Sequence, residues 1–157
     1  MASKARKAFD DNVNDVNRLL ELHAKEGGKG KGRRYDLEAL NKSAIVLITA
    51  FWEAYCEDIA EEALAHIIEH AQDSSALPDS LQKVVLNDLK QEKHDLAMWK
   101  LADDGWRSVL RDQFDDLKER RNRKLNTPKW EHIDNLFMDA IGLEKVSSSW
   151  KWGKKMT

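Results

Sequence analysis

The sequence has little cysteine, proline or glycine and no long hydrophobic run. A single cysteine, Cys56, excludes an internal disulfide, and a chain without disulfides suits the reducing cytoplasm, where we expect this protein to reside. No run of about 18 apolar residues is present. The amino-terminal segment Met1 to Lys7 also lacks an apolar core, so we predict neither a membrane span nor a signal peptide. Two prolines and seven glycines leave few interruptions for long helices.

The charge of the chain is nearly balanced. Its 26 basic and 28 acidic residues give a net charge of −2, so the molecule as a whole does not indicate nucleic-acid binding, and any RNA contact requires a local basic patch. With 41% hydrophobic and 34% charged residues among 157, the composition is typical of a charged, helix-rich globular chain of about one domain.

Apolar residues recur at steps of three and four along most of the chain, which predicts an all-α, up-and-down bundle of five helices with one long central helix. Asp36 is a plausible N-cap for the long helix, Thr127 and Pro128 favour the start of the last one, and Gly142 favours its end. The expected helices cover residues 4–25, 36–72, 79–92, 106–117 and 128–141. We expect their apolar stripes to face the core: Phe9, Val13, Val16, Leu20 and Ala24 in the first helix, Leu81, Val85 and Leu89 in the third, Trp106, Val109, Leu110, Phe114 and Leu117 in the fourth, and Trp130, Ile133, Phe137 and Ile141 in the fifth.

The long helix has two different halves. Residues 44–52 are apolar on every side, so we expect this segment to be surrounded by other helices. After Glu53 the apolar residues narrow to one stripe that includes Cys56, which we interpret as a core thiol rather than a nucleophile.

Two basic clusters are candidate RNA-binding surfaces, because lysine and arginine neutralise phosphates and arginine also stacks on bases. The first lies in the glycine-rich segment 27–34, which alternatively is a linker, and the second lies near residues 118–124, where cations alternatively complement a helix C-terminus. The residues that we assign to RNA binding are Lys29, Lys31, Arg33, Arg34, Arg120, Arg121 and Arg123.

Glu62, His66 and His70 lie four residues apart on one face of the long helix. Two histidines at this spacing can share a zinc ion, but the surrounding face is charged and no HExxH order is present. We therefore interpret the face as solvated and predict neither a metal site nor a cofactor.

Metal-independent RNA cleavage uses a proton-transferring group, usually histidine, and a cation that stabilises charge on phosphorus. One close pair, Arg18 and His23, has this composition. Five residues subtend about 140° on a helix, so the two side chains diverge, and we interpret the pair as coincidental.

The sequence contains four distinctive segments, RRYDLEALNKSAIVL at 33–47, WEAYCED at 52–58, NTPKWEHIDNLF at 126–137 and SSSWKW at 147–152. Together these segments resemble the HEPN domains of the RiboL-PSP type, which occur in bacterial defence and toxin systems. The resemblance implies a helical domain over residues 1–157 that dimerises, with an RNA-cleaving site where two subunits meet. Homodimerisation or a complementary helical partner is therefore expected.

In the family that this chain resembles, the catalytic residues form an R-x4-6-H motif on a helix that follows the SSSW segment. The sequence stops at Thr157, so we expect the body of an endoribonuclease whose catalytic segment is absent and which is inactive alone. The resemblance carries no catalytic role onto Arg18 or His23. It gives Glu53 a role in orienting the missing Arg or His, whereas the alternative is a solvated helix carboxylate. The second interpretation is a non-catalytic helical module that pairs with another HEPN protein.

Overall fold

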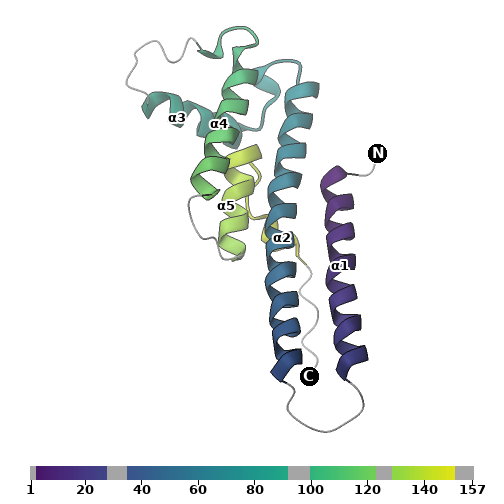
Figure 1. The fold of residues 1–157 in the computed structure, drawn as a ribbon. Helices are drawn as coiled ribbons and strands as arrows, with labels where there is room; N and C mark the ends of the chain where they lie inside the picture. Colours follow the sequence, from purple (N-terminus) through teal and green to yellow (C-terminus); the bar gives the residue numbers. More distant parts are fainter. Residues whose placement is uncertain (1–2, 28–34, 92–99, 123–128, 151–157) are drawn as a thin grey trace. The chain divides into compact units, whose positions relative to one another are not determined.

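The computed structural model describes residues 3–27, 35–91, 100–122 and 129–150, and no strand occurs within these ranges. Five α-helices, one of them long, confirm the predicted all-α fold (Figure 1). None of the helices in the described ranges combines the length and apolar character needed to cross a membrane. The elements are α1 Lys4–Gly27, α2 Tyr35–His70, the short 3₁₀ segment η1 Ser74–Ala76, α3 Asp79–Gln91, α4 Gly105–Asn122, α5 Trp130–Ile141 and the 3₁₀ segment η3 Val146–Ser149.

The chain forms two compact units, Met1–Ile59 and Ala60–Thr157. The first unit contains α1 and the part of α2 that ends at Ile59. The second unit contains the remainder of α2 together with α3, α4, α5 and both 3₁₀ segments.

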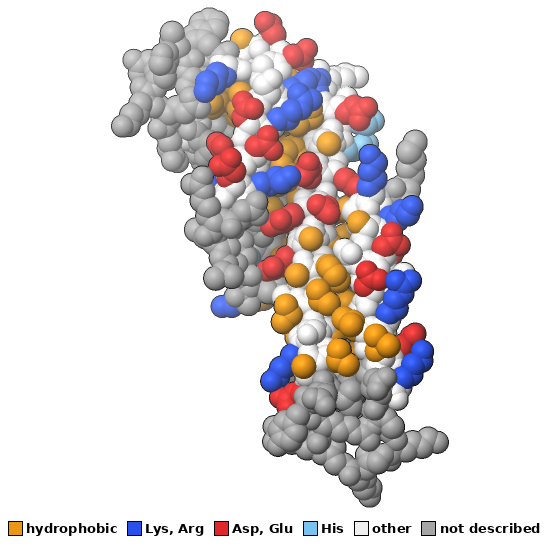
Figure 2. All heavy atoms as spheres, in the orientation of Figure 1, with side chains coloured by type: hydrophobic (Ala, Val, Ile, Leu, Met, Phe, Trp, Pro, Cys, Tyr) orange, Lys and Arg blue, Asp and Glu red, His pale blue; other side chains and the backbone are white. Residues whose placement is uncertain are grey.

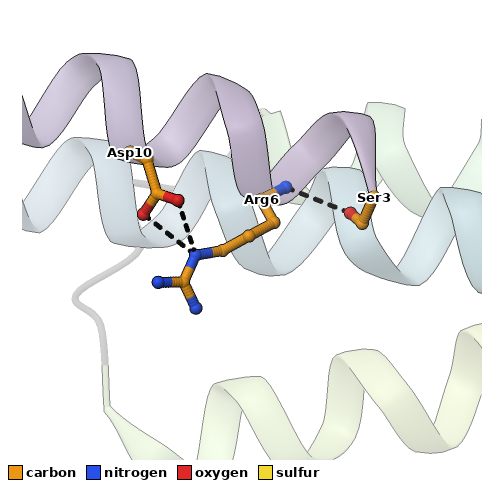
Figure 3. Close-up of polar contacts among 3 residues, drawn as sticks. All are labelled: Ser3, Arg6 and Asp10. Carbon is orange, nitrogen blue, oxygen red and sulfur yellow. Dashed lines mark hydrogen bonds and ion pairs between the residues drawn. The ribbon is translucent and has the colours of Figure 1, made fainter. Parts of the chain in front are cut away.

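The start of α1 is held by two local polar contacts (Figure 3). Ser3 Oγ accepts a hydrogen bond from the Arg6 backbone N–H at 3.0 Å, which satisfies one of the donors that every helix leaves unpaired at its N-terminus. The Arg6 guanidinium lies one turn from Asp10 and donates from Nε to both carboxylate oxygens, at 2.9 and 3.0 Å. Both side chains are exposed, so this ion pair adds only tenths of a kcal/mol, roughly 0.3–0.5.

Within the first unit, α1 packs against α2 through three aromatic rings. The Phe9 ring centroid lies 6.0 Å from that of Trp52 and 4.9 Å from that of Tyr55, and the last two rings are 5.7 Å apart. These tilted and edge-on arrangements suit the ring quadrupoles and add to the burial of apolar area. The predicted stripe on α1 is confirmed at Val16, which is buried, but Leu20 is 45% exposed.

The expectation that residues 44–52 are surrounded on every side is wrong. Ala44 is buried, but Ile45 and Val46 are 65% and 67% exposed. The physical reason is geometric: within this unit α1 is the helix that packs on α2, and one neighbouring helix buries one face. An apolar face of α2 therefore stays open to solvent, and Figure 2 shows hydrophobic side chains gathered in this region.

The second unit has an extensive core. α3 packs against α4 and α5, α4 packs against α5, and η3 lies on α5. Among the described residues, Leu81, Leu110 and Leu136, one from each of these three α-helices, are the largest side chains that are essentially fully buried. The predicted apolar stripes of α3 and α4 are confirmed by the burial of all their residues except Val109, which is half-buried. The buried residues are Leu81, Val85, Leu89, Trp106, Leu110, Phe114 and Leu117.

Gly142 ends α5 as the sequence predicts. Its backbone is left-handed, with φ 71°, and its N–H donates to the Met138 carbonyl at 2.9 Å. A Cβ atom at this position would also lie 2.6 Å from the Leu81 backbone nitrogen, so α3 approaches too closely for any side chain. Ser80 Oγ donates to the Gly142 carbonyl, which joins the start of α3 to the end of α5.

Arg107, at the start of α4, holds the C-terminal end of α2. Its guanidinium donates to the Ile68 carbonyl and, at 2.7 Å, to the Ala71 carbonyl. The same group lies 4.2 Å from the centre of the Trp106 ring, which is buried. The side chain thus satisfies carbonyls that the end of a helix leaves without partners.

Two predicted helix starts differ from those observed. α2 begins at Tyr35, so Asp36 lies inside its first turn rather than at the N-cap. α5 begins at Trp130 after Lys129, whose backbone is extended (ψ 144°), and Lys129 therefore occupies the cap position that the sequence predicts for Thr127. Trp130, which the periodicity places toward the core, is 53% exposed at this end of the helix.

Candidate functional site

Glu53 lies on α2 next to the aromatic cluster formed by Phe9, Trp52 and Tyr55. The residue is half-buried, and its carboxylate oxygen Oε1 is shielded from solvent. A carboxylate in this setting is not the fully solvated helix glutamate of the alternative interpretation. Its role in orienting an arginine or histidine stays a prediction, because that interaction requires a second group.

The pair Arg18 and His23 lies on α1. Arg18 is 77% exposed and its Nη1 atom donates to Asp15 at 2.9 Å, one turn earlier on the same helix. The side chain of His23 lies outside the described residues. What the structure describes at this position is a surface ion pair within one helix.

The two basic clusters are described only in part. Lys29, Lys31, Arg33, Arg34 and Arg123 lie outside the described residues, as does the side chain of Arg121.

In the second cluster the described side chains of Lys118 and Arg120 have intramolecular partners. Lys118 Nζ lies 2.7 Å from Glu61 Oε2 on α2, and exposed Arg120 donates from Nε to the Asp116 carbonyl of its own helix at 3.3 Å. Carboxylates at Asp115, Asp116 and Glu119 alternate with these cations. The surface is therefore of mixed charge, and an RNA strand would have to displace a salt bridge to use Lys118.

The segment SSSW at 147–150 is fixed to α5 by one aspartate. Asp134 accepts hydrogen bonds from the Ser147 backbone N–H at 2.8 Å and from Ser147 Oγ at 2.7 Å, with one carboxylate oxygen for each donor. Trp150, at the end of η3, is half-buried, whereas Trp152 lies outside the described residues. The contact places the end of the described chain against α5.

Cys56 is buried, at 3% exposed, as predicted for a core thiol. His66 and His70 are both exposed, and their ring centroids lie 4.0 Å apart. Within the described ranges no group of three or more His, Cys, Asp or Glu side chains is arranged to hold a metal ion.

Sequence reasoning missed two residues that organise the second unit, Arg107 and Asp134. Each acts on a partner that is not a neighbour in sequence: Arg107 on carbonyls 36 and 39 residues away, and Asp134 on a serine 13 residues away. The sequence offered only a cation near a helix end and an acid near a run of serines. Such combinations are too common to identify these contacts.

The described helices define an all-α domain with a buried carboxylate oxygen on its longest helix and a mixed-charge surface on α4. The family model described as RiboL-PSP-HEPN matches residues 10–156, which is nearly the whole chain. The chain belongs to the RiboL-PSP-HEPN family, as its resemblance in sequence indicated. No curated protein and no solved structure matches the chain.

Proposed function

We propose that this chain forms the body of a HEPN-type, metal-independent endoribonuclease of a bacterial defence or toxin system. The observation that carries the proposal is the family match over residues 10–156, since the HEPN name implies this class of ribonuclease. Glu53 supports it, because a carboxylate oxygen shielded from solvent on α2 is suited to orient a catalytic arginine or histidine supplied by another segment or subunit.

In this proposal the chain by itself does not cleave RNA. The only Arg–His pair of the required spacing, Arg18 and His23, lies on α1, where Arg18 is engaged with Asp15. The test is incubation with labelled tRNA and mRNA in the presence of a chelator, with three proteins: the chain, its His23→Ala variant, and a longer version extended past Thr157.

The expected result is no cleavage by the chain or by His23→Ala and cleavage by the longer product, provided that it contains an R-x4-6-H motif. Glu53→Gln in the longer product should then lower kcat more than RNA affinity. Cleavage by the chain that His23→Ala abolishes would move the active site to α1 and overturn the proposed inactivity. A longer product that carries the motif and cleaves neither RNA would overturn the ribonuclease assignment.

RNA binding is proposed for the C-terminal end of α4. Replacing Arg120, Arg121 and Arg123 together by alanine should weaken binding of a labelled RNA. The slope of the logarithm of the binding constant against the logarithm of the salt concentration should also decrease in magnitude, by roughly one unit for each phosphate that the variant no longer neutralises. Lys83→Ala, an exposed lysine on α3, is the matched control. An unchanged salt slope in the triple variant would exclude this surface.

The alternative function is a non-catalytic helical module that pairs with another HEPN protein. The observation that favours it is the open apolar face on α2, where Ile45 and Val46 are more than half exposed. Large exposed apolar groups in a row are typical of surfaces that associate. The same face suits the homodimer that the family resemblance implies, so pairing is proposed in either case.

Association can be tested without any knowledge of the activity. Sedimentation of the chain over a range of concentrations should show a dimer, and Ile45→Glu with Val46→Glu should shift it to monomer. Asn14→Glu, an exposed polar position on α1, adds a negative charge outside this face and should leave the dimer unchanged. A wild-type chain that stays monomeric at high concentration would contradict pairing with a second copy.

A further inference from the structure

Two histidine rings lie together on the surface near the C-terminal end of α2. His66 and His70 are one helical turn apart and both are exposed. Their ring centroids are 4.0 Å apart, with the ring planes tilted by 30°. This spacing is common on helix surfaces, so binding of a ligand also depends on which ring nitrogens carry a lone pair.

The hydrogen bond of His70 determines its tautomer. His70 Nδ1 lies 2.9 Å from the His66 carbonyl oxygen. A carbonyl can only accept, so Nδ1 carries the proton. In the neutral ring Nε2 is then left with a lone pair. Histidines that bind metals are held in this way, with one ring nitrogen donating to a carbonyl or carboxylate and the other free to ligate.

We propose that His66 and His70 form a two-imidazole site for a divalent transition-metal ion of the Cu²⁺, Ni²⁺ or Zn²⁺ class. Metal–nitrogen bonds of about 2.0–2.1 Å place two ligand nitrogens roughly 3 Å apart. The ring centroids are 4.0 Å apart and the ring planes are tilted by only 30°, so both rings have to turn about their side-chain torsions until their in-plane lone pairs converge on one ion. Since no set of three or more ligating side chains occurs in the described part of the chain, water completes the coordination sphere and the ion exchanges readily.

The charges around the two histidines have opposing effects on the binding of a cation. Glu62 lies one turn before His66, Glu69 is adjacent to His70, and the carbonyl end of the helix carries partial negative charge, all of which favour a cation. The guanidinium of Arg107, bound to the Ile68 and Ala71 carbonyls, opposes it. The pair therefore binds one ion weakly rather than acting as a structural metal centre, and removal of the Arg107 charge should tighten binding.

Ion selectivity distinguishes this site from general attraction to carboxylates. Imidazole nitrogen binds Cu²⁺ more tightly than Ni²⁺ or Zn²⁺, whereas Mg²⁺ and Ca²⁺ require oxygen ligands. Calorimetric titration of the whole chain should therefore show one saturable Cu²⁺ per chain, weaker binding of Zn²⁺ and Ni²⁺, and no heat of binding for Mg²⁺ or Ca²⁺.

Histidine variants assign the binding to the pair. His66→Ala or His70→Ala should weaken Zn²⁺ binding at least about tenfold, since even the loss of an outer partner of a ligand costs 10–100-fold. His132→Ala, which removes an exposed histidine on α5, should leave the affinity unchanged. Circular dichroism of each variant checks that the helices are intact.

A thermal shift gives a second readout. Zn²⁺ should raise the Tm of the wild-type chain and of His132→Ala but not of the double variant His66→Ala, His70→Ala, because an ion that binds the folded state stabilises it. Wild-type affinity and stoichiometry in the double variant would overturn the site, and so would the absence of saturable binding to the wild-type chain. Either outcome leaves the RNA-cleavage proposal untouched, since that chemistry uses no metal.

Discussion

The two units of the molecule differ in how many of their apolar side chains they bury. Of the 20 buried hydrophobic side chains in the described ranges, four lie in the unit that ends at Ile59 and sixteen in the unit from Ala60 onward. Among the described residues the first unit exposes four large apolar side chains, Leu20, Leu22, Ile45 and Val46, whereas the longer second unit exposes two, Trp130 and Leu143. Two helices side by side bury one face each, whereas several helices around a common core bury whole stripes. The comparison indicates that the second unit buries a core of its own, whereas the first leaves much of its apolar surface exposed.

The sharpest test of this contrast is a pair of truncations. Leu136→Ala removes a side chain that is 1% exposed and should lower the free energy of unfolding by about 2–5 kcal/mol. Ile45→Ala, at a position 65% exposed, should change it by less than about 0.5 kcal/mol at low protein concentration. Urea unfolding measures both values.

If Ile45→Ala lowered the free energy of unfolding as much as Leu136→Ala does, Ile45 would have to be buried in solution. That result would contradict the contrast between the two units. Repeating the measurement over a range of protein concentrations separates the causes. A cost that grows with concentration identifies a second copy on this face, since association stabilises by mass action.

The next largest effect is expected at Arg107. Arg107→Ala leaves the Ile68 and Ala71 carbonyls without their guanidinium donor and should cost about 2–3 kcal/mol, because hydrogen bonds to charged groups contribute more than neutral ones. Arg111→Ala, an exposed arginine on the same helix, is the control and should change stability little.

Hydrogen exchange localises the effect of the Arg107 variant. Protection should fall in the last turn of α2 and at the start of α4, within the second unit, while the amides around Phe9 in α1 keep theirs. Equal loss of protection in α1 would show that the two units unfold together.

The smallest effect is a pH dependence at the turn before α3. Hydrogen bonds from the Ser75 side chain and then its backbone N–H hold the pKa of Asp73 below its ordinary value of 3.8. A carboxyl whose pKa is lower in the folded state adds stability above its unfolded pKa, and this stability is lost as pH falls through the lowered value. Asp73→Asn should therefore reduce stability slightly at pH 7 and become equal to wild type at low pH. A difference that persists unchanged at pH 2 would assign the effect to the turn geometry rather than to the charge.

Much of the fold could be predicted because its signals are local. The four-residue spacing of Leu81, Val85 and Leu89 placed their stripe toward the core, and Gly142 marked the end of α5 because few other residues adopt its left-handed backbone. The candidate site was predictable only as residue types: Glu53 was identified through the family resemblance, and the basic clusters through composition. Spacing alone did not reveal that Lys118 is paired with Glu61.

The sequence by itself determined the helices, their main apolar stripes and the family. The tertiary structure decided which apolar residues are covered: Ile45 and Trp130 were predicted to be buried and are exposed, because burial depends on how many elements pack against a face. It also decided the polar contacts of Arg107 and Asp134, whose partners lie far along the chain. Periodicity is a property of one helix, and these contacts are properties of several elements packed together, which no local pattern encodes.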